Sequence, residues 1–145
     1  MRLLGISVLK IKEEYLRLKI SKVSELKDCV INLTRKLEPS LSREEILADI
    51  KKRDKMGDGL VSSSILIIHV IDQKIKQDTI FYITLENKIS YFSVSEKNDY
   101  QLTKVILLAI NPKHSLTNKN HLVNFIEDKW ALISDTPLTK RLFKD

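Results

Sequence analysis

Glycine, cysteine and long apolar runs are all scarce in this sequence. Its 145 residues include only 3 glycines, and no GxGxxG or GxxxxGK[ST] motif is present, which argues against a dinucleotide or P-loop nucleotide site. The single cysteine, Cys29, has no partner for an internal disulfide or a thiolate metal site. It falls within a helical pattern, where a small buried side chain is a simpler interpretation than a reactive thiol.

Membrane and export signals are also missing. The longest apolar run covers residues 105–110, far short of the roughly 20 residues needed to span a bilayer. The first four residues do not open a signal peptide with a cleavage site. A hydrophobic fraction of 43% and a charged fraction of 30% are ordinary for a globular protein. We therefore expect one cytoplasmic domain over residues 1–145, without membrane insertion.

The charge is positive but dispersed. The net charge is +6 and the pI is about 9.4, which raises the question of a nucleic-acid partner. The lysines are scattered among carboxylates, and no aromatic residues interleave with a basic run as a single-strand platform requires. We expect a solvated, lysine-rich surface and no nucleic acid, although the positive balance would help to dock an acidic or phosphorylated partner.

The order of apolar patterns and turn residues predicts a mixed α/β (α+β) domain. Apolar spacing and a capping box predict two early helices, and continuous or alternating apolar runs predict the strands. The expected elements are a strand at 15–20, a helix at 23–37 capped by Ser21 or Ser24, a helix from Ser42 to Gly57, strands at 65–68, 79–85, 88–94 and 104–110, a helix over 122–133 and a short helix from 136. The simplest packing is a mixed sheet of about five strands flanked by helices.

The sequence contains only three histidines, and two of them are candidate site residues. His69 ends the first continuous apolar strand, and His121 opens the helix after the second, so both can reach one sheet edge. Arg53 ends the helix before the His69 strand and could bind phosphate oxygens. These groups beside a helix amino terminus suggest an anion site, although a hydrogen-bonded structural histidine is the alternative. His114 is assigned to solvent. No third ligand completes a zinc site, and Ser62–Ser64 lacks nucleophile-elbow glycines.

The stretch from Arg53 to His69, RDKMGDGLVSSSILIIH, resembles enzyme IIA of the fructose/mannitol class of the bacterial sugar phosphotransferase system (PTS). That family carries R-E-x-L-G-S-T-G-I-G-x-G-I-A-I-P-H, which ends in the phosphorylated histidine. Residues 53–57 match R-E-x-L-G without a gap, and Val61, Ile65, Ile67 and His69 match later positions. Two features depart from the pattern: the turn reads DGLVSSS, and Ile68 replaces the proline before the histidine.

The resemblance extends along most of the chain. VILLAINPKHSLTNKNHL is similar to the strand, loop and helix start that carry the family's second histidine, and His121 takes that position. The resemblance implies a phosphoryl relay in which His69 accepts the group from the carrier HPr and passes it to a IIB domain. His121 would stabilise the phosphoryl group and Arg53 would neutralise its charge, without a metal or other cofactor. The alternative is a regulatory module that controls a sugar-responsive transcription regulator by phosphorylation or docking.

Overall fold

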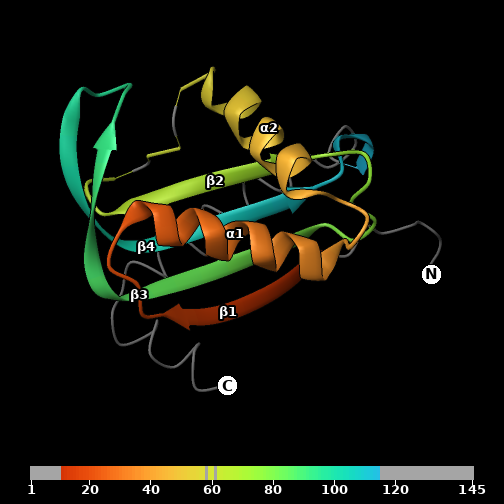
Figure 1. The fold of residues 1–145 in the computed structure, drawn as a ribbon, viewed down its shortest axis with the longest axis horizontal. Helices are drawn as coiled ribbons and strands as arrows, with labels where there is room; N and C mark the ends of the chain where they lie inside the picture. The colour runs from red at the N-terminus through yellow and green to blue at the C-terminus, as the bar shows by residue number, and fades with distance from the viewer. Residues whose placement is uncertain (1–10, 58, 61, 115–145) are drawn as a thin grey trace.

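The computed structural model describes residues 11–57, 59–60 and 62–114. Six named elements follow one another along this part of the chain, as Figure 1 shows. They are β1 (Lys12–Leu18), α1 (Val23–Leu37), α2 (Arg43–Asp54), β2 (Ile65–Ile71), β3 (Thr79–Ser93) and β4 (Asn98–Ile110). The mixed α+β class is confirmed, with four strands in the described chain instead of about five.

The strands form one mixed sheet in the order β1-β3-β4-β2. β1 pairs parallel with β3, β3 pairs antiparallel with β4, and β4 pairs parallel with β2. Both α1 and α2 lie on the same face of the sheet (Figure 1). Because β2 is last in the strand order, it is an edge strand, and α2 packs against it.

Two apolar clusters separate the faces of the sheet. The larger cluster joins the helices to one face and includes Leu26 and Val30 of α1, Ile46 of α2 and Val70 of β2. The smaller cluster lies on the other face, where Ile67 and Tyr15 pack against buried β3 and β4 side chains. Because neighbouring strand residues point to opposite faces, these clusters assign a face to the side chains along the regular part of each strand, up to the irregularity between the pairs Thr84–Lys104 and Ile89–Leu102.

The helix α1 confirms the predicted span, but its start differs from the prediction. Its buried residues recur three and four apart, as expected for a helix with one face on the core. The N-cap is Lys22, without a side-chain cap bond, so neither Ser21 nor Ser24 caps the helix. Instead, the backbone N–H of Ser21 donates to the Glu25 carboxylate at 2.8 Å. The Glu25 carboxylate in the first turn of α1 thus binds a backbone N–H just before the helix, and no serine side chain caps the helix.

The capping box at the start of α2 is confirmed. The Ser42 hydroxyl accepts from the Glu45 backbone N–H at 3.1 Å, and the Glu45 carboxylate accepts from the Ser42 N–H at 2.9 Å. The helix ends at Asp54, and Gly57 follows with a φ of +112°. Such a φ strains any residue with a Cβ, so glycine suits this exit from the helix.

The predicted hairpin at Glu86-Asn87 is wrong. Residues 79–93 form one long strand, β3, and the turn to β4 comes only after Ser93. The pair Thr84–Lys104 is followed by Ile89–Leu102, so five residues of β3 advance against two of β4. The polar residues that resemble a turn in the sequence lie in this bulge. The connection between β3 and β4 is short, because β4 already begins at Asn98.

Some predictions fall beyond the described chain. The helix expected over 122–133 and the short helix from 136 lie outside the described residues. No helix among the described residues is long and apolar enough to cross a membrane.

Cys29 of α1 is a free, half-buried cysteine, and burial, followed by the nearby Asp28 carboxylate, raises the pKa of its thiol. This environment agrees with a packing side chain.

Candidate functional site

The connection from α2 to β2 brings a cation close to the strand that carries His69. Arg53 lies in the last turn of α2, and its Nη1 donates to the Gly57 carbonyl at 3.3 Å. Two residues later, the Gly59 carbonyl accepts from the Ile67 N–H of β2 at 2.8 Å. A Cβ on Gly59 would lie 1.7 Å from the Ile67 carbonyl oxygen, so this approach requires glycine. The turn therefore docks closely on β2.

His69 lies inside β2 and not at its last residue, because the strand continues through Val70 and Ile71. It is two residues after Ile67, which packs in the smaller cluster, so its ring is on the face opposite α1 and α2. Burial, followed by the positive charge of Arg53, lowers the pKa of His69 to about 4. The imidazole is thus neutral near pH 7 and has a lone pair available for nucleophilic attack.

The second predicted histidine cannot be placed beside His69, since His121 lies outside the described residues. The assignment of His114 to solvent is wrong. Its side chain is half-buried, and its Nδ1 lies 3.2 Å from the Asp78 carboxylate, whose side chain is 9% exposed. The partner is 36 positions away in the sequence, so local patterns gave no signal for the contact.

A buried asparagine completes the structure around this histidine. Asn111 follows β4, and its side-chain N–H groups donate to the Gln73 and Ile75 carbonyls at 3.1 and 2.9 Å. Its backbone N–H donates to the Asp78 carboxylate at 2.9 Å. These bonds hold the β2–β3 connection against the end of β4, a structural role for Asn111 that no local sequence pattern indicates.

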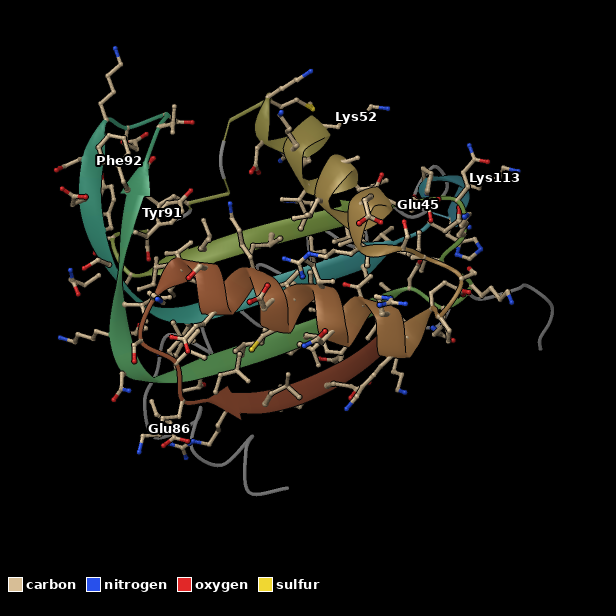
Figure 2. All side chains as sticks on the ribbon, viewed as in Figure 1. Glu45, Lys52, Glu86, Tyr91, Phe92 and Lys113 are labelled. Carbon is tan, nitrogen blue, oxygen red and sulfur yellow. The ribbon has the colours of Figure 1, made fainter. Side chains whose placement is uncertain are left out.

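A group of carboxylates joins α2 to the end of β2. Asp49 lies on α2, and burial of its carboxyl group, followed by the hydrogen bond and charge of Asp72, raises its pKa to about 7. Its Oδ2 atom is buried and accepts no hydrogen bond. Nearby, the Lys74 ammonium donates to Glu45 at 2.7 Å, and Figure 2 shows Glu45 near the start of α2. A proton on Asp49 removes the repulsion between these carboxylates.

The pKa of Asp49 predicts the pH dependence of stability. The native state keeps a proton that the unfolded chain loses near pH 4, so the contribution of Asp49 to the free energy of unfolding falls as the pH rises from about 4 to about 7. We expect Asp49→Asn to be more stable than the native chain at pH 8, by about 1 kcal/mol since solvent screens this partly exposed group, and equally stable near pH 4. Urea unfolding at both pH values measures the difference.

An exposed aspartate provides the control for this experiment. Asp99→Asn, in β4, should leave the free energy of unfolding within about 0.5 kcal/mol of the native value at both pH values. A gain from Asp49→Asn that is the same at pH 4 and pH 8 would show that the Asp49 carboxyl group does not titrate as described.

Other site chemistries have little support in the described chain. Within residues 11–57, 59–60 and 62–114, no group of three histidine, cysteine, aspartate or glutamate side chains could hold a metal ion. The described serines at 62–64 provide turn hydrogen bonds, since the Ser62 hydroxyl accepts from the Ser64 N–H at 3.2 Å. Among the site residues expected from the sequence, Arg53 lies close enough to His69 for its charge to lower the pKa of that histidine.

Comparison with solved structures supplies the fold relationship. The chain is similar to the nitrogen regulatory protein IIA-Ntr from Neisseria meningitidis, with a TM-score of 0.62 and 16% identity over 86% of this chain and 80% of that one. The fold is that of PTS IIA domains. A putative PTS IIA domain from Streptococcus pyogenes M1 GAS is also similar, with a TM-score of 0.52 and 16% identity over 88% of this chain and 78% of that one. Sequence searches match no family model and no curated protein.

Proposed function

We propose that this PTS IIA-like chain is a phosphocarrier that accepts a phosphoryl group on His69. The observation that carries the proposal is the depressed pKa of His69, about 4, with the Arg53 charge as its second cause. A phosphoryl acceptor must be neutral to attack, and a guanidinium near it can offset the charge of the incoming group. The similarity to the fructose/mannitol class in the stretch 53–69 supports the same assignment.

The proposed reaction is an in-line transfer between two imidazoles. The unprotonated ring nitrogen of neutral His69 attacks phosphorus, the phosphorus–nitrogen bond of phosphohistidine on HPr breaks, and the electron pair returns to the leaving imidazole. The other ring nitrogen of His69 loses its proton to solvent, and the leaving imidazole takes up one proton, so the protons balance. Arg53 neutralises charge on the phosphoryl group, and His121 is proposed to stabilise it. Transfer to a cysteine or histidine of a cytoplasmic IIB partner regenerates neutral His69. No cofactor enters this scheme.

The test is phosphorylation of the purified chain with enzyme I, HPr and phosphoenolpyruvate, followed by intact mass measurement. We expect an acid-labile gain of one phosphate that is abolished in His69→Ala. The matched control is His114→Ala, which removes the other described histidine and should retain the modification. Circular dichroism verifies that both variants are folded.

Two outcomes would contradict the proposal. A phosphate gain that persists in His69→Ala would move the acceptor to another residue. No gain in the native chain, with a known IIA domain phosphorylated in parallel, would remove the phosphocarrier function.

A regulatory role is the second candidate. One protein with the same fold is a nitrogen regulatory protein, and the sequence of the turn before β2 departs from the glycine-rich family pattern. Under this alternative, the phosphorylation state or docking of the chain controls a transcription regulator. Pull-down of candidate regulators with native and His69→Glu protein distinguishes the roles, since control requires binding that differs between the two forms.

A further inference from the structure

Three strands bring two cations and a hydroxyl group into one row of the sheet, away from His69. Arg17 of β1 is the register partner of Thr84 of β3, and Thr84 is the register partner of Lys104 of β4. The strands β1, β3 and β4 lie side by side in Figure 1. Register partners share a face, and adjacent strands are about 4.8 Å apart, so the three residues lie within about 10 Å of one another at their Cα atoms.

The row lies on the face opposite α1 and α2. Tyr15, Tyr82 and Ile106 belong to the smaller apolar cluster, and the three row residues are each two positions from one of them. The Tyr15 and Tyr82 rings stack beside the row with centroids 4.9 Å apart, and the Tyr15 hydroxyl donates to the Glu13 carboxylate at 2.9 Å. Thr84 and Lys104 are partly buried, whereas Arg17 is exposed at the edge of the row.

Two polar groups of this row, those of Thr84 and Lys104, are partly buried without a partner among the described residues. The Thr84 Oγ1 atom is buried and has no hydrogen-bond partner. Within the described part of the chain, neither Arg17 nor Lys104 has a side-chain hydrogen bond or an ion pair. Burial lowers the pKa of Lys104, with no neighbouring carboxylate to oppose the shift among the described residues. A half-buried ammonium beside a buried, unpartnered hydroxyl is costly unless a ligand satisfies both.

We propose that Arg17, Thr84 and Lys104 form a binding site for a phosphate group. A tetrahedral oxyanion offers separate oxygens to a guanidinium, a hydroxyl and an ammonium that approach from three strands. Along β2, the row is level with Ile65, four residues before His69, which corresponds to about 13 Å. The site is therefore distinct from the proposed phosphoryl acceptor and does not depend on its activity.

The experiment is an amide NMR titration of the full chain with inorganic phosphate at constant ionic strength, with chloride as the competing salt. The His69→Ala variant is titrated in parallel to remove binding at the acceptor. We expect saturable shifts at Thr84 and Lys104, with a Kd on the order of 1 mM, in both proteins. Glycerol phosphate in a second titration separates the sources of the group: tighter binding than inorganic phosphate indicates a phosphate monoester as the ligand.

Variants locate the determinants. Lys104→Met should weaken phosphate binding at least tenfold, and Thr84→Val should weaken it by removing a hydroxyl from an otherwise similar shape. Arg17→Gln changes an exposed side chain, so it should leave the protein folded. It tests the site even if Lys104→Met or Thr84→Val, at partly buried positions, unfolds the protein. Lys88→Gln, at an exposed β3 position, is the matched control and should bind as the native chain does.

The proposal is overturned by any of three results. The first is that phosphate shifts the amide resonances of Thr84 and Lys104 no more than chloride does. The second is that phosphate shifts only resonances around His69. The third is that the phosphate affinity is unchanged in both Lys104→Met and Arg17→Gln. None of these results depends on whether His69 is phosphorylated.

Discussion

The fraction of His69 that is neutral and able to accept a phosphoryl group is expected to be almost independent of pH between 5 and 7. With a pKa of about 4, about 90% of the imidazole remains neutral at pH 5, whereas an ordinary histidine with a pKa near 6.5 is only about 3% neutral. The fraction of reactive imidazole at pH 5 is therefore roughly 30 times that of an unperturbed histidine. Burial, which disfavours the cation, is the main cause of this difference, and the Arg53 charge is the second.

Phosphoramidate provides a small donor for this measurement, with ammonia as the leaving group. The rate of phosphohistidine formation, located at residue 69 by peptide mass, is divided by the rate for a solvated histidine peptide with the same donor at each pH. The neutral fraction of a histidine with a pKa near 6.5 falls from about 76% at pH 7 to about 3% at pH 5, so the ratio should rise roughly 20-fold over this range. A constant ratio would show that His69 titrates as an ordinary, solvated histidine.

Folding must be verified across this pH range, because the same pKa affects stability. The unfolded chain takes up a proton on His69 near pH 6.5, whereas the native chain does so only near pH 4. Acid therefore favours the unfolded state, and the contribution of His69 to the free energy of unfolding falls as the pH falls from about 6.5 to about 4. Circular dichroism at each pH gives the folded fraction by which the rate is corrected.

Replacing Gly59 with alanine is expected to destabilise the fold by more than about 3 kcal/mol. The added Cβ would lie 1.7 Å from the carbonyl oxygen and 2.8 Å from the carbonyl carbon of Ile67. Both are backbone atoms of β2, and no side-chain rotation can relieve the overlap. The hydrogen bond from the Ile67 N–H to the Gly59 carbonyl holds the two segments together, so the turn must detach to admit the methyl group.

Gly57→Ala provides the matched control in the same turn. Its Cβ would meet only the Ser95 hydroxyl at 3.7 Å, an ordinary contact, while its φ of +112° costs about 1–3 kcal/mol for a residue with a side chain. Thermal unfolding should therefore give a larger decrease in Tm for Gly59→Ala than for Gly57→Ala. Equal decreases would mean that backbone strain, and not the contact with β2, determines the need for glycine here.

Local features of the fold could be predicted from the sequence. The capping box of α2 involves residues three apart, and the α1 pattern repeats within one helix, so each signal is contained in a short stretch. The path of β3 could not be predicted, because Glu86 and Asn87 resemble turn residues when the partner strand is unknown. Their place in a bulge depends on pairing with β4, which only the assembled sheet determines.

The same distinction applies to the site. Arg53 and His69 belong to one stretch of sequence, and the structure brings the Arg53 charge close enough to affect the His69 pKa. The contact between Asp78 and His114, and the row from Arg17 to Lys104, join distant segments. No periodic pattern encodes such contacts, since each depends on strand order and register.

The strand order also has a consequence for the folding pathway. β3 and β4 are joined by a short turn, whereas β1 must meet β3 with Lys12 opposite Thr79, and β2 must meet β4 with Ile65 opposite Lys104. Closing a loop costs more entropy as the sequence separation grows, so the hairpin of β3 and β4 has the lowest closure cost in the sheet. The hairpin can serve as the template on which both edge strands assemble. The strand bearing His69 is then a late addition, and its order depends on a nucleus that contains neither His69 nor Arg53.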